Sequence, residues 1–202
     1  MKKWMKMTAT MMVAAMALTA CGGNDAADDS ADAGETYTVG IIQQLEHPAL
    51  DQATKGFEDK LTELLGDKVK FDYQNAQGEQ ANCATIANNF VAGNYDLILA
   101  NATPALQAAA AGTSDIPILG TSVTEYGVAL GLDDFDGTVG GNISGTSDLA
   151  PLEDQAAMLN ELFPDAKNIG IIYCSSEPNS IYQSTTITKY LEDEGYKIKE
   201  YT

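Results

Sequence analysis

Residues 95–104, YDLILANATP, contain the pattern that decides the fold. The first six residues form an almost continuous apolar run, which is typical of a central parallel strand covered on both faces. Pro104 stands at a first-turn position of an alanine-rich segment, so we expect a helix over residues 103–111. A polar turn, residues 101–104, joins the two. The stretch therefore predicts a strand, a short turn and a helix, which is the repeating unit of an α/β fold with a parallel sheet.

The same unit is repeated on both sides of this stretch. Short β-branched apolar runs predict strands, and apolar residues at helical spacing predict helices. Toward the N-terminus we expect strands at 37–43 and 69–73 and helices at 49–65 and 80–92. Toward the C-terminus we expect a strand at 116–120, helices at 152–163 and 181–194, and strands at 168–173 and 196–201.

Residues 128–143 interrupt this rhythm. They are rich in glycine and carry the acidic cluster Asp133, Asp134 and Asp136, so we expect an irregular or extended connection. Two strand–helix series on either side of such a break predict two parallel-sheet lobes, residues 37–145 and 146–202. Two strands make a poor independent core. The second lobe is therefore either unusually small or, as we favour, truncated in this sequence.

The N-terminal residues have the features of an export signal. Residues 1–20 begin with lysines and continue with an apolar stretch that is short for a membrane-spanning helix. The following Cys21 comes directly after Leu18-Thr19-Ala20, an arrangement that resembles the lipobox of bacterial lipoproteins, in which the cysteine is lipidated. The alternative is an ordinary signal peptide with an incidental cysteine. Residues 21–36 are acidic and almost free of large apolar groups, which predicts a flexible tether.

The charge composition excludes some partners and restricts others. The 202 residues include eleven basic residues, all of them lysine, against 29 acidic residues, for a net charge of −18. Such an acidic chain repels phosphate backbones, so we expect no nucleic-acid partner. Without arginine, the chain lacks the usual bidentate clamp for a carboxylate or phosphate. An anionic ligand group would have to be held by backbone amides, hydroxyls, side-chain amides or lysine.

Polar side chains follow the predicted strands. Parallel strands place their carboxyl ends at one edge of a sheet, where ligands bind in open α/β folds. Nearly all of these loops are rich in Asn, Gln, Ser, Thr or Glu, which is the composition of a hydrogen-bonding cleft. The loops are residues 43–48, 74–78, 101–104, 121–125, 145–148 and 174–180. Taken singly, each such residue is more often a helix N-cap than a ligand contact.

Catalytic and metal sites are not supported by the motifs. His47 is the single histidine, and Asp51 lies one helical turn away, so the two could form an acid–base pair. No nucleophile elbow, P-loop or metal-ligand spacing accompanies them, so a structural or ligand-orienting His47 is favoured. We expect no metal and no cofactor. We favour unpaired thiols for Cys83 and Cys174 over the disulfide that an exported compartment would permit.

Six motifs together carry a family resemblance. They are residues 46–51 (EHPALD), 74–78 (QNAQG), 102–105 (ATPA), 117–124 (PILGTSVT), 145–151 (GTSDLAP) and 173–180 (YCSSEPNS). Over residues 37–202 the sequence resembles substrate-binding lipoproteins of ABC importers of the tryptophan/aromatic-amino-acid type, which have the periplasmic-binding-protein type I fold. That family is longer than this chain, and it usually has Asn at the position of Cys174.

The resemblance implies two lobes that close on a small molecule and then dock on a membrane permease driven by its ATPase. The protein would be lipid-anchored at the extracytoplasmic face of the bacterial cell membrane. An aromatic amino acid such as tryptophan or phenylalanine is the implied ligand, with Leu45, Pro48, Pro104 and Tyr126 as candidate apolar walls.

Polarity and loop position then suggest roles for nine residues toward an amino acid. Carboxylates suit its ammonium, while hydroxyls and helix N-terminal amides suit its carboxylate. Amide side chains would complete the site. The candidates are Glu46 and Asp148 for the ammonium, Thr103, Thr121, Ser122 and Ser176 for the carboxylate, and Gln43, Asn101 and Asn179 as further contacts.

Two other functional classes stay open. A ligand-sensing receptor module would use the same fold with a signalling partner. A small α/β enzyme would depend on His47 and is the weaker alternative. If the protein is a binding protein, one ligand should stabilise its fold and should not be chemically converted.

Overall fold

A computed structural model describes residues 36–202. The expected signal peptide, the candidate lipidation site Cys21 and all of the acidic tether except Thr36 lie outside these residues. Within the described part, no helix combines the length and the apolar composition needed to cross a bilayer. The expected α/β class is confirmed, because both sheets are parallel and every sheet has helices packed on it.

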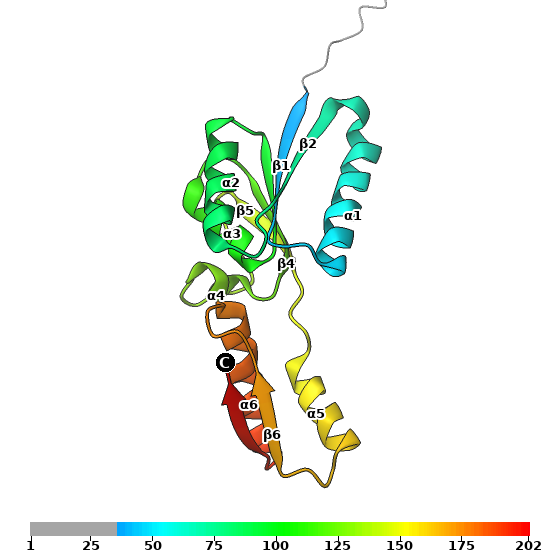
Figure 1. Ribbon diagram of the computed structural model, residues 1–202, viewed down its shortest axis with the longest axis vertical. Coiled ribbons are helices and arrows are strands. Elements are labelled where there is room, and N and C mark those ends of the chain that lie inside the picture. Colours follow the sequence, from blue (N-terminus) through cyan, green and yellow to red (C-terminus); the bar gives the residue numbers. More distant parts are fainter. Residues whose placement is uncertain (1–35) are drawn as a thin grey trace, which may run out of the picture. The chain divides into compact units, whose positions relative to one another are not determined.

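The first sheet contains five parallel strands in the order β2-β1-β3-β4-β5 (Figure 1). The strands are β1 (Tyr37–Gln43), β2 (Val69–Asn75), β3 (Leu97–Asn101), β4 (Ile118–Val123) and β5 (Ile143–Ser147). In β1, side chains alternate between the two faces of the sheet, yet Val39, Ile41 and Ile42 are all buried. Both faces of the sheet centre must therefore be covered by helices.

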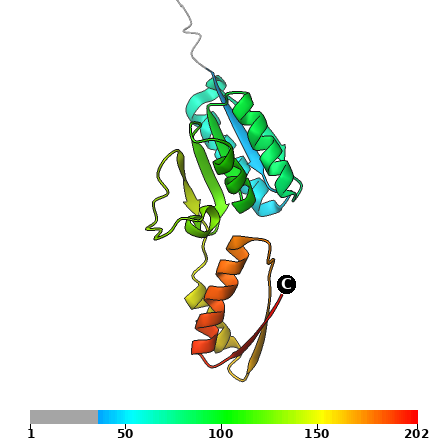
Figure 2. The same ribbon diagram turned by 90° about the vertical axis from the view of Figure 1, so that its left-hand side faces the viewer.

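Helices cover the two faces of this sheet separately (Figures 1 and 2). On one face, Ile41 and Leu99 pack with Phe57 and Leu61 of α1 (Pro48–Leu65). On the other face, Ile42 and Ile98 belong to a cluster with residues of α2 (Gln80–Ala92) and α3 (Thr103–Gly112). A short 3-10 turn, Gly66–Lys68, follows α1. This is the doubly wound arrangement that the apolar run at 95–100 predicts.

Residues 131–142 form the expected irregular connection, but the two ends of the range 128–143 are regular. One end overlaps helix α4 (Tyr126–Leu130), and the other begins strand β5. The carboxylate of Glu125 accepts hydrogen bonds from the backbone N–H groups of Gly127 at 2.9 Å and Val128 at 2.6 Å, and so caps α4. Strand β5 pairs with β4 but is mostly exposed, so it lacks the apolar pattern by which a strand is recognised. The boundary drawn after residue 145 falls inside β5.

The second sheet has two parallel strands, β6 (Asn168–Ile172) and β7 (Lys197–Tyr201). Helices α5 (Leu152–Leu162) and α6 (Pro178–Asp193) accompany them. Buried residues of this small core are Ala156, Leu191 and Tyr196. Ile172 is 85% exposed, so one apolar side chain at the end of β6 is left uncovered by the described residues. Cys83 is buried and Cys174 is exposed, and the two do not pair with each other in the part of the chain that the structure describes.

A substitution at Gly40 tests how tightly α2 packs on the first sheet. A Cβ at this position of β1 would collide with the ring of Phe90, which is 2% exposed and packs against Tyr95 with 4.7 Å between ring centroids. Gly40→Ala should therefore lower the free energy of unfolding by about 1–3 kcal/mol through overpacking. Urea denaturation of the full chain measures the change.

The matched control is Gly56→Ala in α1, where nothing lies within 4 Å of the added Cβ. Helix propensity should raise its stability by roughly 0.5–1 kcal/mol. Equal effects at the two sites would contradict the packing of Phe90 on β1.

Candidate ligand-binding site

The carboxyl ends of the five parallel strands meet at one edge of the first sheet. Backbone hydrogen bonds join neighbouring ends: Gln44 N–H donates to Asn101 O at 3.2 Å, and Ala102 N–H donates to Thr121 O at 3.0 Å. At the far side, Asp148 N–H donates to Val123 O at 3.0 Å. The loops that follow β1, β3, β4 and β5 are thus brought together, as the sequence predicts.

Two of the nine predicted contacts are fully buried at this edge, and a third is nearly so. Gln43 and Asn101, which end β1 and β3, are 0% exposed, and Thr103 at the start of α3 is 2% exposed. The amide of Gln43 makes three internal hydrogen bonds: it donates to Leu45 O and to Asp51 Oδ1, and it accepts from Thr54 Oγ1. Gln43 and Asn101 therefore form the buried support of the edge, and Thr103 begins the helix that follows Asn101.

The other predicted contacts are more accessible. Glu46, Asp148 and Ser176 are exposed, and Thr121, Ser122 and Asn179 are half-buried. The hydroxyl of Ser176 lies 3.1 Å from Cys174 Sγ. The Oδ1 atom of Asn179 has no hydrogen-bond partner among the described residues. The carboxylates proposed for an ammonium are thus free to meet a ligand, whereas the amides of β1 and β3 are enclosed.

Two turns at this edge have unusual backbone conformations. Ala102 follows β3 with a φ of 89°, and Ser122 near the end of β4 has a φ of 55°. Residues with a Cβ seldom adopt positive φ, and such positions cluster at binding and catalytic sites. Their coincidence at the ends of two adjacent strands supports a functional role for this edge.

His47 has a structural role at the start of α1. Its Nδ1 atom accepts a hydrogen bond from Ala49 N–H at 3.2 Å, which makes it the N-cap of the helix. Asp51 Oδ1 accepts from Gln43 Nε2 at 2.6 Å. The side chains of the suggested acid–base pair thus bond to other groups, in agreement with the favoured structural reading of His47.

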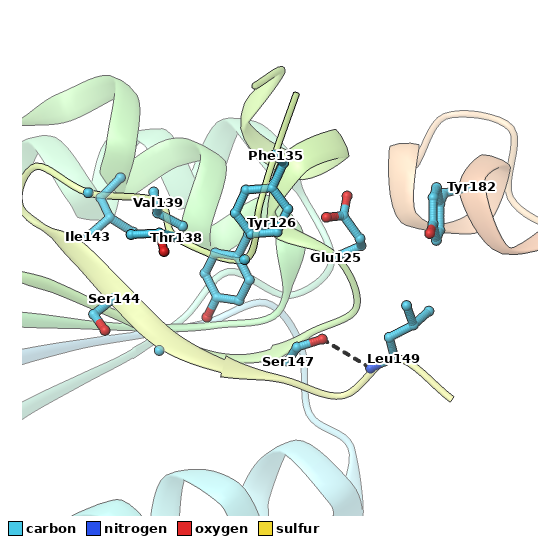
Figure 3. A pocket seen from close by; sticks show the side chains of 13 residues that line it. Glu125, Tyr126, Phe135, Thr138, Val139, Ile143, Ser144, Ser147, Leu149 and Tyr182 are labelled. Atoms are coloured by element: carbon cyan, nitrogen blue, oxygen red, sulfur yellow. Dashed lines mark hydrogen bonds between the residues drawn. The ribbon is translucent and has the colours of Figure 1, made fainter. Parts of the chain in front are cut away.

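A pocket of about 640 Å³ lies beside β5 and α4 (Figure 3). Its lining includes Glu125, Tyr126, Phe135, Val139 and Ile143. None of the nine predicted contacts lines it, although Tyr126 was expected as an apolar wall. The sequence analysis did not predict Phe135 as a lining residue. In the sequence it is a single aromatic residue within the acidic cluster of residues 133–136. Gln43 lines a separate pocket of about 240 Å³ together with Asp51, Thr54 and Tyr73.

Tyr126 is fixed between β4 and β5. Its hydroxyl donates to Thr146 O at 3.3 Å and lies where a Cβ on Gly120 or Gly145 would be. Burial raises the pKa of this phenol to about 12, and the negative charge of Asp148 acts in the same direction. The ring forms a rigid wall of the pocket and carries no charge at neutral pH.

A doubly wound parallel sheet with hydrogen-bonding side chains at its strand ends has the architecture of a small-molecule binding domain. The chain belongs to the family of ABC transporter substrate-binding proteins, since the model of that family matches residues 38–202. The expected family resemblance is thereby confirmed. This is a family of transport proteins, which argues against the enzyme alternative.

Individual relatives agree with this membership. The chain is 40% identical over 191 residues to a tyrosine-binding protein of Clostridioides difficile, covering 91% of this chain and 55% of the relative. A Streptococcus pneumonia ABC domain solved in complex with L-Trp is 35% identical, with a TM-score of 0.77 over 83% of this chain and 57% of that one. The ligand-free, open structure of a Clostridium difficile substrate-binding protein with adhesive properties is 39% identical, with a TM-score of 0.63 over 82% and 57%. The chain thus spans little more than half the length of these relatives.

The raised pKa of Tyr126 predicts a pH dependence of stability. The neutral phenol is favoured in the folded state, because its pKa there is about 12 against an ordinary value of 10.0. This contribution is complete below pH 10 and is lost as the pH rises toward 12. The free energy of unfolding should therefore fall less between pH 9 and about 11 in Tyr126→Phe than in the wild type.

Urea denaturation at several pH values measures this difference. Tyr37→Phe, at an exposed site on β1, is the control and should follow the wild-type profile. Identical alkaline profiles for Tyr126→Phe and the wild type would contradict the burial of the phenol.

Proposed function

We propose that this protein is the extracytoplasmic solute-binding component of an ABC importer and that its ligand is an aromatic amino acid. The observation that carries the proposal is the joint similarity, at 40% and 35% identity, to a tyrosine-binding protein and to a domain solved with L-Trp. The ligand named for each of these two relatives, tyrosine or tryptophan, is an amino acid with a large aromatic side chain. The ligand would be captured between two lobes and delivered to the permease.

The sheet edge offers complementary chemistry for such a ligand. Without arginine, the carboxylate of the amino acid would be bound by hydroxyls and backbone N–H groups near Thr103, Thr121 and Ser122. The exposed carboxylates of Glu46 and Asp148 would bind the ammonium. Gln43 and Asn101 would support these contacts from beneath, and Ser176 and Asn179 would contribute from the second lobe.

Isothermal titration of the full chain tests the ligand class. L-tyrosine, L-tryptophan or L-phenylalanine should bind with heat release, and L-leucine should bind far more weakly because it lacks a ring for aromatic contacts. Glu46→Gln and Thr103→Val should each weaken binding of the aromatic ligand by about 1–3 kcal/mol, since each removes a polar partner from the ligand.

Glu161→Gln, an exposed change at the end of α5, is the control and should leave the affinity unchanged. Absence of binding to all three aromatic amino acids would refute the proposed ligand class. Unchanged affinity in both site variants would refute the assigned contacts while leaving the ligand class intact.

Lipid anchoring at Cys21 is part of the proposal. Two or more acyl chains hold a protein on a membrane stably, whereas a single chain does so only marginally. In a bacterial host, Cys21→Ser should shift the protein from the membrane fraction to the soluble extracytoplasmic fraction and abolish incorporation of a labelled fatty acid. Cys174→Ser is the matched control, because it removes an exposed thiol elsewhere in the chain. Label that persists in Cys21→Ser would show that the anchor lies at another residue.

A further inference from the structure

A chain of hydrogen bonds joins α1 to the ends of β1 and β3. Gln43 Nε2 donates to Asp51 Oδ1 at 2.6 Å, and Thr54 Oγ1 donates to Gln43 Oε1 at 2.8 Å. Asn101 Nδ2 donates to Thr54 Oγ1 at 2.9 Å and to Leu50 O at 2.9 Å. Three secondary-structure elements thus meet at one hydroxyl, that of Thr54.

The carboxylate of Asp51 decides which group donates and which accepts in each hydrogen bond of this network. A carboxylate can only accept, so the Gln43 amide must present its nitrogen to Asp51 and its oxygen to Thr54. The hydroxyl of Thr54 then donates its only proton to Gln43 and can only accept from Asn101. Asn101 therefore presents its nitrogen to Thr54 and Leu50, and its Oδ1 is left without a partner among the described residues.

Burial makes this direction hard to reverse. Gln43 and Asn101 are 0% exposed and Thr54 is 5% exposed, so their polar atoms depend mainly on one another for hydrogen bonds. Turning the Asn101 amide around would place its oxygen against two acceptors, Leu50 O and Thr54 Oγ1, so both bonds from Asn101 would be lost and Oδ1 would gain no donor from either. An unpaired buried polar group is costly, so one free acceptor is the cheaper arrangement.

The same hydrogen-bond network also fixes the loop between β1 and α1. Gln43 Nε2 donates a hydrogen bond to Leu45 O at 2.9 Å, and Asn101 Nδ2 donates one to Leu50 O in the first turn of α1. These bonds lie on either side of Glu46 in the sequence. The backbone of Asn101 leads directly into the turn at Ala102 and to Thr103. Two proposed ligand contacts, Glu46 and Thr103, are therefore positioned by the same buried network.

We propose that Thr54 and Asp51 are positioning residues of the ligand site. They do not touch the ligand; they lock the two amides of Gln43 and Asn101 in one orientation and so fix the loops that carry Glu46 and Thr103. The inference rests on the proposed function for its effect on affinity. The orientation of the network can be tested without any ligand.

Thr54→Val and Thr54→Ser separate the hydroxyl from the shape of the side chain. Valine keeps the volume but leaves Gln43 Oε1 and one Asn101 N–H unpaired, so the affinity for L-tyrosine or L-tryptophan should fall at least about tenfold. Serine keeps the hydroxyl and should stay within about threefold of the wild type. Asp51→Asn should weaken binding to an intermediate degree, because an amide can present either a donor or an acceptor to Gln43.

Loss of stability alone must be distinguished from loss of positioning. Leu106→Ala, in the α3 core cluster, is the matched control: it should lower the melting temperature at least as much as Thr54→Val, and its affinity should stay near wild type. Titrations are performed well below the melting temperature of each variant.

The side-chain amide signals of Gln43 and Asn101 in ¹⁵N NMR of the ligand-free protein provide a second readout. They should exchange slowly with water in the wild type and in Thr54→Ser, and much faster in Thr54→Val. Wild-type affinity and slow exchange in Thr54→Val would overturn the inference. If the wild type binds no aromatic amino acid while the amide signals behave as expected, the proposed function fails and the network stands.

Discussion

The burial of β1 on both faces is the constraint on which the first sheet depends. Ile41 packs on α1 and Ile42 packs toward α2 and α3, so the strand cannot be stable unless both helical layers are present. The same requirement fixes the register in which β1 pairs with its neighbours, because a shift of one residue would move each of its side chains to the opposite face of the sheet. Gly40 completes the arrangement, because only a residue without Cβ lets the ring of Phe90 approach the strand. The helices in turn hold the strand ends where the loops converge.

Polarity changes abruptly where these strands end. Ile42 is followed by Gln43 and Ala100 by Asn101, and all four residues are fully buried. A buried amide needs partners, and here they come from Asp51, Thr54 and Leu50 of α1. The apolar core and the polar edge are therefore parts of one packed unit. The exposed carboxylates and half-buried hydroxyls are carried on loops that start from this unit.

The sequence predicts the framework of the first sheet well and its last strand poorly. Strands β1 and β3 are recognised because they are buried on both faces and so contain continuous apolar runs. Strand β5, with the sequence ISGTS, is held by pairing with β4 and by the fit of Tyr126 against Gly145, neither of which leaves a local apolar pattern. The short helix α4 depends on the Glu125 cap and likewise lacks enough turns to show periodicity.

The sequence predicts that polar side chains gather at one edge of the sheet, but it predicts less of how they are arranged there. Gln43 and Asn101 were singled out because parallel strands place their carboxyl ends together. Their enclosure could not be read from the sequence, since it depends on α1 lying over them. Thr54 was missed for the same reason: its partners lie 11 and 47 residues away in the chain.

The left-handed backbone of Ala102 has a consequence for the flexibility of the turn after β3. Glycine would adopt a φ of 89° without steric penalty, but it would also give the unfolded chain and the turn itself many more accessible conformations. Alanine accepts torsional strain of about 1–3 kcal/mol and narrows that range. The Cβ of Ala102 thus keeps the peptide planes leading to Thr103 in a small set of orientations, so this turn is stiffened by covalent geometry as well as by hydrogen bonds.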